Sequence, residues 1–125
     1  MDNVTIRIRN SDFQKEDQKY VWSTALTDSN NRNKTINGET KYASITKTVL
    51  DATVKSLYAL KRPCVVTITT DSQLLNDVFN NHKLEAIIKK QWKQPTGEDI
   101  KFADLWKHLA VMSCMHDISV FNTVF

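Results

Sequence analysis

The stretch CVVTITTDSQLL, residues 64–75, decides the fold class of this sequence. Its first part, CVVTITT, is mostly β-branched, too short for a helix and bounded by a proline, so it predicts a strand. Asp71 and Ser72 end the strand pattern, and the apolar pair that follows them begins a helical pattern. The sequence therefore places a strand directly before a helix, with Asp71 at the junction.

Three strands and a helix are predicted before this stretch. Residues 4–9 (VTIRIR) alternate strictly between apolar and polar side chains, which predicts a half-buried strand. Two more strands are expected at 20–27 and 34–42, joined by the polar turn DSNNRN. From Ser44 the apolar residues recur at intervals of three and four, which predicts a helix that ends near Lys61, shortly before a proline.

Three helical pieces and a strand are predicted to complete the chain. The helices are expected at about 72–80, 82–92 and 101–114, and ISVFNTVF (118–125) reads as the last strand. The order is therefore β-β-β-α-β-α-α-α-β. Because the fourth strand returns through a helical crossover, we expect a mixed five-stranded α/β sheet. A chain of 125 residues fits one core, so we predict a single domain over residues 1–125.

The composition is that of a folded protein. Hydrophobic residues make up 41% and charged residues 25%, far from the signature of disorder. A net charge of +3 permits an anionic partner without requiring one. Neither a signal-peptide core nor a membrane-length apolar run is present in the sequence, so we expect a cytoplasmic protein with no membrane partner.

The element order and several motifs resemble ribonuclease H of the bacterial type-one kind over nearly the whole chain. KTING, then TVL, then SLYALKRPCVVTITTDSQLL can be laid on the family from its third to its fourth strand. Downstream, KKQWK is similar to the end of the family's basic protrusion, and DLWKHL, with Trp106, to its next helix. The resemblance implies an RNase H-like fold that lacks the family's final helix, since the sequence ends at Phe125.

The same resemblance identifies lost metal ligands. The family cleaves the RNA strand of an RNA–DNA hybrid with two divalent metal ions held by four carboxylates. One of the four, at the end of the fourth strand, matches Asp71. The first aspartate falls on Arg9, or on Asn10 with a one-residue shift, the helical glutamate falls on Val49, and the last aspartate lies beyond the end of the sequence. The resemblance therefore implies an inactive relative without metal, in which Mg²⁺ or Mn²⁺ matters only if nuclease activity survives.

Asp71 has two structural interpretations. Arg9 and Asp71 would end adjacent strands on the same face, so the guanidinium would stand in a metal position and pair with the carboxylate. Alternatively, Asp71 caps the helix that follows it. Either role is compatible with a chain that has lost catalysis.

The segment HKLEAIIKKQWKQ (82–94) resembles the family's substrate-binding handle. In such a handle, cations meet phosphates and an aromatic ring packs against sugar or base. The candidate nucleic-acid-binding residues are Lys83, Lys89, Lys90, Trp92 and Lys93. The ligand would be an RNA–DNA hybrid or a structured RNA. A solvated amphipathic helix with a half-buried tryptophan explains the pattern equally well.

The sheet face that the family's final helix covers is the second candidate surface. Most residues assigned to this face are small or polar, which agrees with a face open to water or to a polar partner. A protein partner would meet it at Arg7, Arg9, Phe121 and Phe125. Small viral or mobile-element proteins that block host enzymes would use such a surface.

Other features of the sequence bear on the choice of function. The family's glycine-rich first loop, which approaches the RNA 2′-hydroxyls, is replaced by the acidic stretch SDFQKEDQK (11–19), which weakens the case for hybrid recognition. We expect the three histidines to be surface or capping residues, and Trp22 and Trp106 to be core residues. The sequence slightly favours an inactive nucleic-acid-binding module over a protein-interaction module, and both over a residual metal-dependent ribonuclease.

Overall fold

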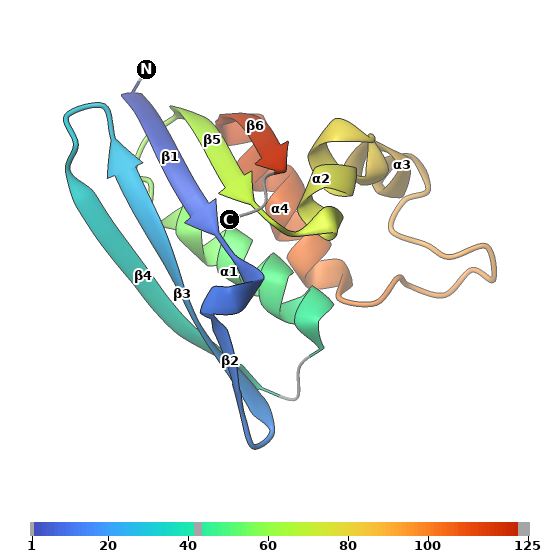
Figure 1. Cartoon of the computed structure of the whole chain (residues 1–125). Coiled ribbons are helices and arrows are strands. Elements are labelled where there is room, and N and C mark those ends of the chain that lie inside the picture. The colour runs from blue at the N-terminus through green and yellow to red at the C-terminus, as the bar shows by residue number, and fades with distance from the viewer. Residues whose placement is uncertain (1, 42–43, 123–125) are drawn as a thin grey trace.

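A mixed sheet forms the body of the molecule, with helices packed behind it (Figure 1). The computed structural model describes residues 2–41 and 44–122. The strands are β1 (Asp2–Ile8), β2 (Phe13–Glu16), β3 (Lys19–Asp28), β4 (Asn33–Lys41), β5 (Cys64–Thr70) and β6 (Asp117–Asn122). The helices are α1 (Ile45–Tyr58), α2 (Gln73–Asn80), α3 (Lys83–Lys89) and α4 (Ala103–Met115), and a 3-10 helix, η1 (Asn10–Asp12), separates β1 from β2.

The strand pairing confirms the predicted mixed α/β sheet. Strand β1 is antiparallel to β3 and parallel to β5, and β5 in turn pairs in parallel with β6. Strand β4 pairs with β3 along almost its whole length. The parallel pairs arise because the chain passes through α1 between β4 and β5, and through three helices between β5 and β6.

The predicted number of five strands is wrong, because residues 13–16 form a sixth. Strand β2 pairs with the first half of β3, and Phe13 stands opposite Trp22. It lies along β3 beyond β1, so these two short strands share one position in the sheet. Sequence reasoning took this stretch for a charged loop, since three of its four residues are exposed and polar. Pairing with β3 and the burial of Phe13 outweigh that local signal.

The core lies between the sheet and the helices α1 and α4 (Figure 1). Burial alternates along β1 from Asn3 onward and along the whole of β5, in agreement with the sequence pattern. Complete burial of an aliphatic side chain such as Ile6, Ile68 or Leu57 stabilises the fold by roughly 1.5–3 kcal/mol. Among the described helices, none combines the length and the apolar character needed to cross a membrane.

Trp22 anchors α1 to the β3–β4 hairpin. Its side chain is 1% exposed, which confirms the predicted core position. The indole Nε1 donates to Thr40 Oγ1 at 3.2 Å, and that hydroxyl donates to Asp51 Oδ2 on α1 at 2.6 Å. Gly38 stands opposite Trp22, and a Cβ atom at Gly38 would lie 2.2 Å from the indole ring. A glycine is therefore required for the tryptophan to fit.

The bounds of most elements follow the sequence prediction closely. Strand β5 occupies the predicted residues 64–70, and Ser44 is the N-cap of α1, where its Oγ accepts from the backbone N–H of Lys47 at 3.2 Å. Helix α1 ends at Tyr58, three residues before the predicted Lys61. Proline disfavours a helical conformation in the residue before it, so the chain leaves the helix well before Pro63.

His116 is buried where α4 ends, whereas His82 and His108 are exposed as predicted. The Nδ1 atom of His116 accepts a hydrogen bond from the backbone N–H of Cys64 at 3.1 Å. Burial lowers the pKa of His116, because a charged imidazolium is poorly solvated there. The ring is therefore held neutral and joins the end of α4 to the start of β5.

Candidate functional site

Asp71 and Arg9 follow two neighbouring parallel strands. The register pairs Ile8 with Thr70, so the chain leaves β1 and β5 side by side at this edge. Asp71 Oδ1 accepts a hydrogen bond from the backbone N–H of Asn10 at 2.9 Å. The predicted adjacency of the strand ends is confirmed, and the described contact of Asp71 is with the backbone just after Arg9. The ion pair between Arg9 and Asp71 stays a prediction.

The prediction that Asp71 caps the following helix is wrong. Ser72 is the N-cap of α2, and its Oγ accepts from the backbone N–H of Leu75 at 3.5 Å. A capping side chain must reach the free amides of the first helical turn, and Ser72 is the residue that immediately precedes this turn. The carboxylate of Asp71 instead reaches across to the chain beyond β1.

The residues at the family's ligand positions do not fit a two-metal centre. Val49 is 2% exposed and belongs to the core, so it offers neither a ligand atom nor access to solvent. The nearest acid along α1, Asp51, is engaged by Thr40 and, at 3.3 Å, by Lys55. Within residues 2–41 and 44–122, no three His, Cys, Asp or Glu side chains gather as a metal site. The described part of this edge thus holds a single family carboxylate, beside a half-buried arginine.

The helix in the handle segment (82–94) is shorter than the predicted helix over 82–92. Helix α3 ends at Lys89, and the backbone N–H groups of Gln91 and Trp92 bond back to the carbonyls of Ile88 and Ile87. Gln91 and Trp92 both have left-handed φ angles, 55° and 64°. This pair of bonds is the Schellman ending of a helix, which usually has glycine at the first left-handed position. Trp92 therefore lies in a turn and not at the end of the predicted helix over 82–92, and Lys93 follows this turn.

The five candidate nucleic-acid-binding residues differ in their surroundings. Lys89 and Lys90 are exposed, while the ring of Trp92 is half-buried against the core. The ammonium of Lys83 lies 5.9 Å from the ring centroid of Trp106, and Lys93 forms an ion pair with Asp99. Of the five, Lys89 at the end of α3 and Lys90 and Trp92 in the turn that follows lie in one short stretch of the chain.

Asp99 is a residue of this region that sequence reasoning missed. Lys93 and Asp99 also form an isolated antiparallel bridge, and the backbone N–H of Gln94 donates to the backbone carbonyl of Glu98 at 2.7 Å. Between them lies a turn with Gly97 at φ 90°. The polar stretch QPTGED (94–99), with its proline and glycine, predicts this turn, and the structure confirms it; the pairing of Lys93 with Asp99 across the turn was not predicted.

The open sheet face is the surface of β1, β3, β5 and β6 on the side away from α1 and α4, in the part of the chain that the structure describes. Near the end where β1, β5 and β6 finish, a row of paired residues crosses this face: Ala25, Arg7, Thr69 and Phe121. Phe121 is 59% exposed and Arg7 is exposed, as the sequence pattern predicts. Phe125, the remaining candidate for this surface, lies outside the described residues.

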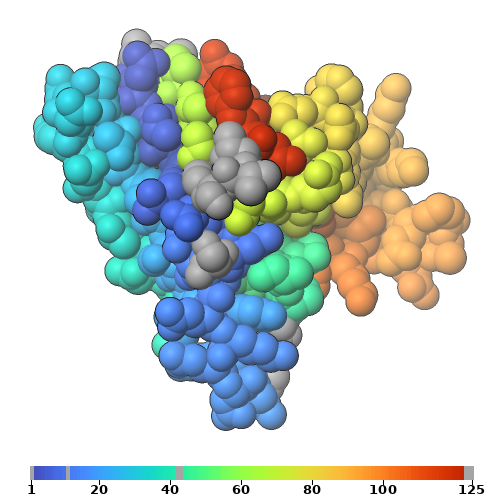
Figure 2. All heavy atoms as spheres, in the orientation of Figure 1, coloured from blue at the N-terminus to red at the C-terminus, as the bar shows by residue number. Residues whose placement is uncertain are grey.

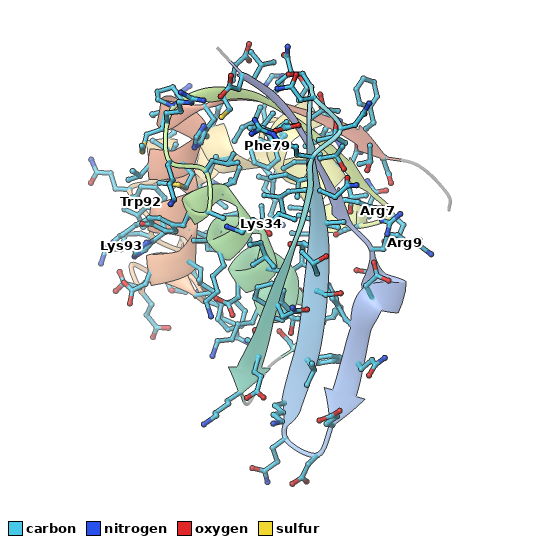
Figure 3. All side chains as sticks on the ribbon, turned by 90° about the vertical axis from the view of Figure 1, so that its left-hand side faces the viewer. Arg7, Arg9, Lys34, Phe79, Trp92 and Lys93 are labelled. Carbon is cyan, nitrogen blue, oxygen red and sulfur yellow. The ribbon has the colours of Figure 1, made fainter. Side chains whose placement is uncertain are left out.

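The two candidate surfaces are on different sides of the molecule. Figure 3 shows Arg7 and Arg9 on one side of the sheet, and Trp92 and Lys93 on the other side, beyond α4. Figure 2 shows the segment around residues 90–100 projecting from one flank of the body. A single small partner would therefore meet one surface or the other.

Comparisons with known proteins agree with this geometry. The RNase H family model matches residues 11–122. Ribonuclease H of Lachnoclostridium phytofermentans is 44% identical over 70 residues, which cover 56% of this chain and 44% of the relative. Ribonuclease H of Legionella pneumophila (strain Lens) is 34% identical over 72% of this chain and 62% of the relative. The matched part is therefore less than two thirds of each relative's length.

Solved structures give the same fold. LC9-RNase H1, a type 1 RNase H with the type 2 active-site motif, has a TM-score of 0.74 at 13% identity, over 94% of this chain and 61% of that chain. The foamy viral protease-reverse transcriptase in complex with RNA/DNA hybrid has a TM-score of 0.56 at 13% identity, over 99% of this chain and 17% of that chain. Such low identities show the fold alone. Because the family model spans most of the sequence, the chain belongs to the RNase H family.

Proposed function

We propose that this chain is a nucleic-acid-binding module of the RNase H family that has lost RNA cleavage. The observation that carries the proposal is the exposed pair Lys89–Lys90 beside Trp92, on a segment that projects from the body (Figure 2). Two adjacent cations attract the phosphate backbone, and an aromatic ring that is half-buried against the core gives a sugar or base a surface to stack on. An RNA–DNA hybrid, or an RNA with duplex regions, is the ligand that family membership favours.

Loss of cleavage is supported by the residues beside Asp71. Catalysis with two metal ions needs several anionic ligands, because each ion carries two positive charges that must be balanced locally. At the matching positions the chain has Arg9 and Val49. A permanently charged guanidinium next to Asp71 repels Mg²⁺ and lowers its local concentration.

The test is fluorescence anisotropy of a labelled RNA–DNA hybrid titrated with protein at low and then physiological salt, with Mg²⁺ present. We expect a salt-sensitive rise that does not decay. The double variant Lys89→Ala/Lys90→Ala should weaken binding and reduce the slope of log K against log salt by about 0.9 for each phosphate that is no longer neutralised. Its matched control is Lys15→Ala/Lys41→Ala, which removes two exposed lysines elsewhere.

Two outcomes would contradict this function. A flat anisotropy signal at low salt would show that the chain does not bind the hybrid and would rule out the proposed function. A decay of the signal, with product strands on a gel in Mg²⁺ or Mn²⁺, would show cleavage and would make the chain a residual ribonuclease.

A second function, as a protein-interaction module, is favoured by the exposed Phe121 and Arg7, which lie on either side of Thr69 in one row of the open sheet face. An apolar ring within a polar face provides an anchor for a partner, and the arginine favours an acidic one. The discriminating variants are Arg7→Glu and Phe121→Ser. If either abolishes a complex that Lys89→Ala/Lys90→Ala leaves intact, the open sheet face is the functional surface.

A further inference from the structure

A groove lies at the opposite end of the sheet from Asp71. It is lined by residues at the starts of β1 and β5 and around the turn of the β3–β4 hairpin. These ends of the strands lie at the top of the view in Figure 1. Its volume is about 560 Å³, within the usual range for small-molecule sites. A whole strand length separates it from Asp71, so neither candidate nucleic-acid contacts nor the lost ligand positions belong to it.

The floor of this groove is apolar. Val4, Leu26 and Cys64 are core side chains that are 8%, 5% and 3% exposed, and they form the end of the hydrophobic core. Ala59 and Leu60, which follow α1, complete the wall. A ligand body that covered this floor would remove apolar surface from water, which favours binding.

The rim of the groove is cationic. It contains four basic residues and two acidic ones, and each acid holds one arginine: Asp2 pairs with Arg62 at 2.8 Å, and Asp28 pairs with Arg32 at 2.7 Å. Hydrogen bonds from the Arg32 backbone and side chain lower the pKa of Asp28, so this carboxylate stays ionised.

Lys34 and Lys61 supply the excess positive charge of the rim. Neither lysine has a carboxylate partner among the described residues. Lys34 pairs with the floor residue Leu26 in the β3–β4 register, and Figure 3 shows it on the helix side of the sheet, where the groove lies. Two cations without an acid therefore stand beside an apolar floor.

We propose that this groove binds a small organic anion with an apolar body and one carboxylate group. The body covers Leu26 and Leu60, and the carboxylate meets Lys34 and Lys61. Nucleic acid fits less well, since its backbone needs a long row of free cations and both arginines are already paired here. The proposal does not depend on the nucleic-acid function of the opposite end.

The probe for this site is 1-naphthaleneacetate, which combines a flat apolar body with a carboxylate. Titration into ¹⁵N-labelled protein should shift the amide signals of Leu26, Lys34, Leu60 and Cys64 saturably and leave those of Lys89 and Lys90 unchanged. The neutral analogue 1-naphthaleneethanol has nearly the same body without the charge. It should bind about tenfold more weakly, because it lacks the contact with the two lysines.

Charge reversal tests the rim directly. The variant Lys34→Glu/Lys61→Glu should lower the affinity for 1-naphthaleneacetate by about tenfold or more, since two attractive contacts become repulsive. Its affinity for 1-naphthaleneethanol should be unchanged. The control Lys15→Glu/Lys41→Glu has the same change in net charge at two exposed lysines elsewhere and should bind both probes as the parent does. Lys34→Arg/Lys61→Arg keeps the charges and should retain binding.

Any of the following results would overturn the proposal. The first is the absence of saturable shifts at millimolar 1-naphthaleneacetate. The second is shifts that spread over the whole surface or gather at another site. The third is equal affinity for the acid and the alcohol, or an unchanged affinity for the acid in Lys34→Glu/Lys61→Glu with a parent-like spectrum.

Discussion

The helix-covered side of the sheet and the projecting segment around residues 90–100 are held together in different ways. In the first, large side chains such as Trp22 are fully enclosed and joined to distant elements by buried hydrogen bonds. In the second, Trp92 and Ile100 are only half-buried against the core, and the chain turns on itself with left-handed residues at Gln91 and Trp92 and an exposed ion pair between Lys93 and Asp99. We therefore expect stability to depend on the first region and binding on the second.

The largest effect should come from Gly38→Ala. A methyl group 2.2 Å from the indole ring forces Trp22 to move, which strains the core and endangers its bond to Thr40. We expect a loss of about 3 kcal/mol in the free energy of unfolding. Urea denaturation measures it, with Asn37→Ala as the neighbouring control on the same strand. A change no larger than that of the control would show that the hairpin yields easily at Trp22.

The next effect is a dependence of stability on pH through His116. Its pKa is lowered in the folded state, so the unfolded chain binds more protons below about pH 6.5. This contribution to stability is complete above the unfolded pKa, and it decreases as the pH falls from about 7 to about 5. Denaturation curves across this range should show a smaller slope in His116→Gln, whose amide oxygen can still accept from Cys64. An equal slope in both proteins would assign the dependence to other groups.

A smaller effect is expected for Ser72→Ala at the start of α2. The hydroxyl caps the helix through a long bond of 3.5 Å, so its removal should cost only about 0.5–1 kcal/mol. Ser72→Asp keeps an acceptor at the same position and should retain most of the stability. If Ser72→Ala is neutral while Asp71→Ala is not, Asp71 contributes more to this junction than Ser72.

The smallest effect, with the opposite sign, is expected for Gln91→Gly. The left-handed conformation is nearly free of strain in glycine, so this variant should gain about 0.5 kcal/mol in thermal unfolding. Lys90→Gly is the control, because Lys90 has an ordinary φ of −85° and gains nothing from glycine. A loss of stability in Gln91→Gly would mean that the glutamine side chain itself stabilises the turn.

The sequence predicted best where burial repeats regularly. Strand β5 and the start of α1 were found to the residue, because Ile68 and Leu50 belong to strict periodic patterns. Prediction from the sequence failed where pairing with another segment decides the structure. Phe13 is an example, because its strand forms by pairing with the part of β3 that contains Trp22.

The candidate site was only partly predictable. The family motif located Asp71, but its described partner is the backbone N–H of Asn10. Every residue except proline has this group, so the sequence does not show which N–H will be the partner. The end of α3 was missed for a related reason. Gln91 is not a typical helix-ending residue, so the left-handed turn that moves Trp92 off the helix gave no local signal.

The parallel pairing of β1 with β5 has a consequence for how the chain folds. Asp2 pairs with Cys64 and Ile8 with Thr70, so the central pair of the sheet closes a loop of about sixty residues. Contacts between segments so far apart form late and slow the folding of a domain. During synthesis on the ribosome, β1 emerges first but cannot pair with β5 until more than sixty further residues have been made. Strands β3 and β4 are joined by a short turn, so they can pair with each other much earlier.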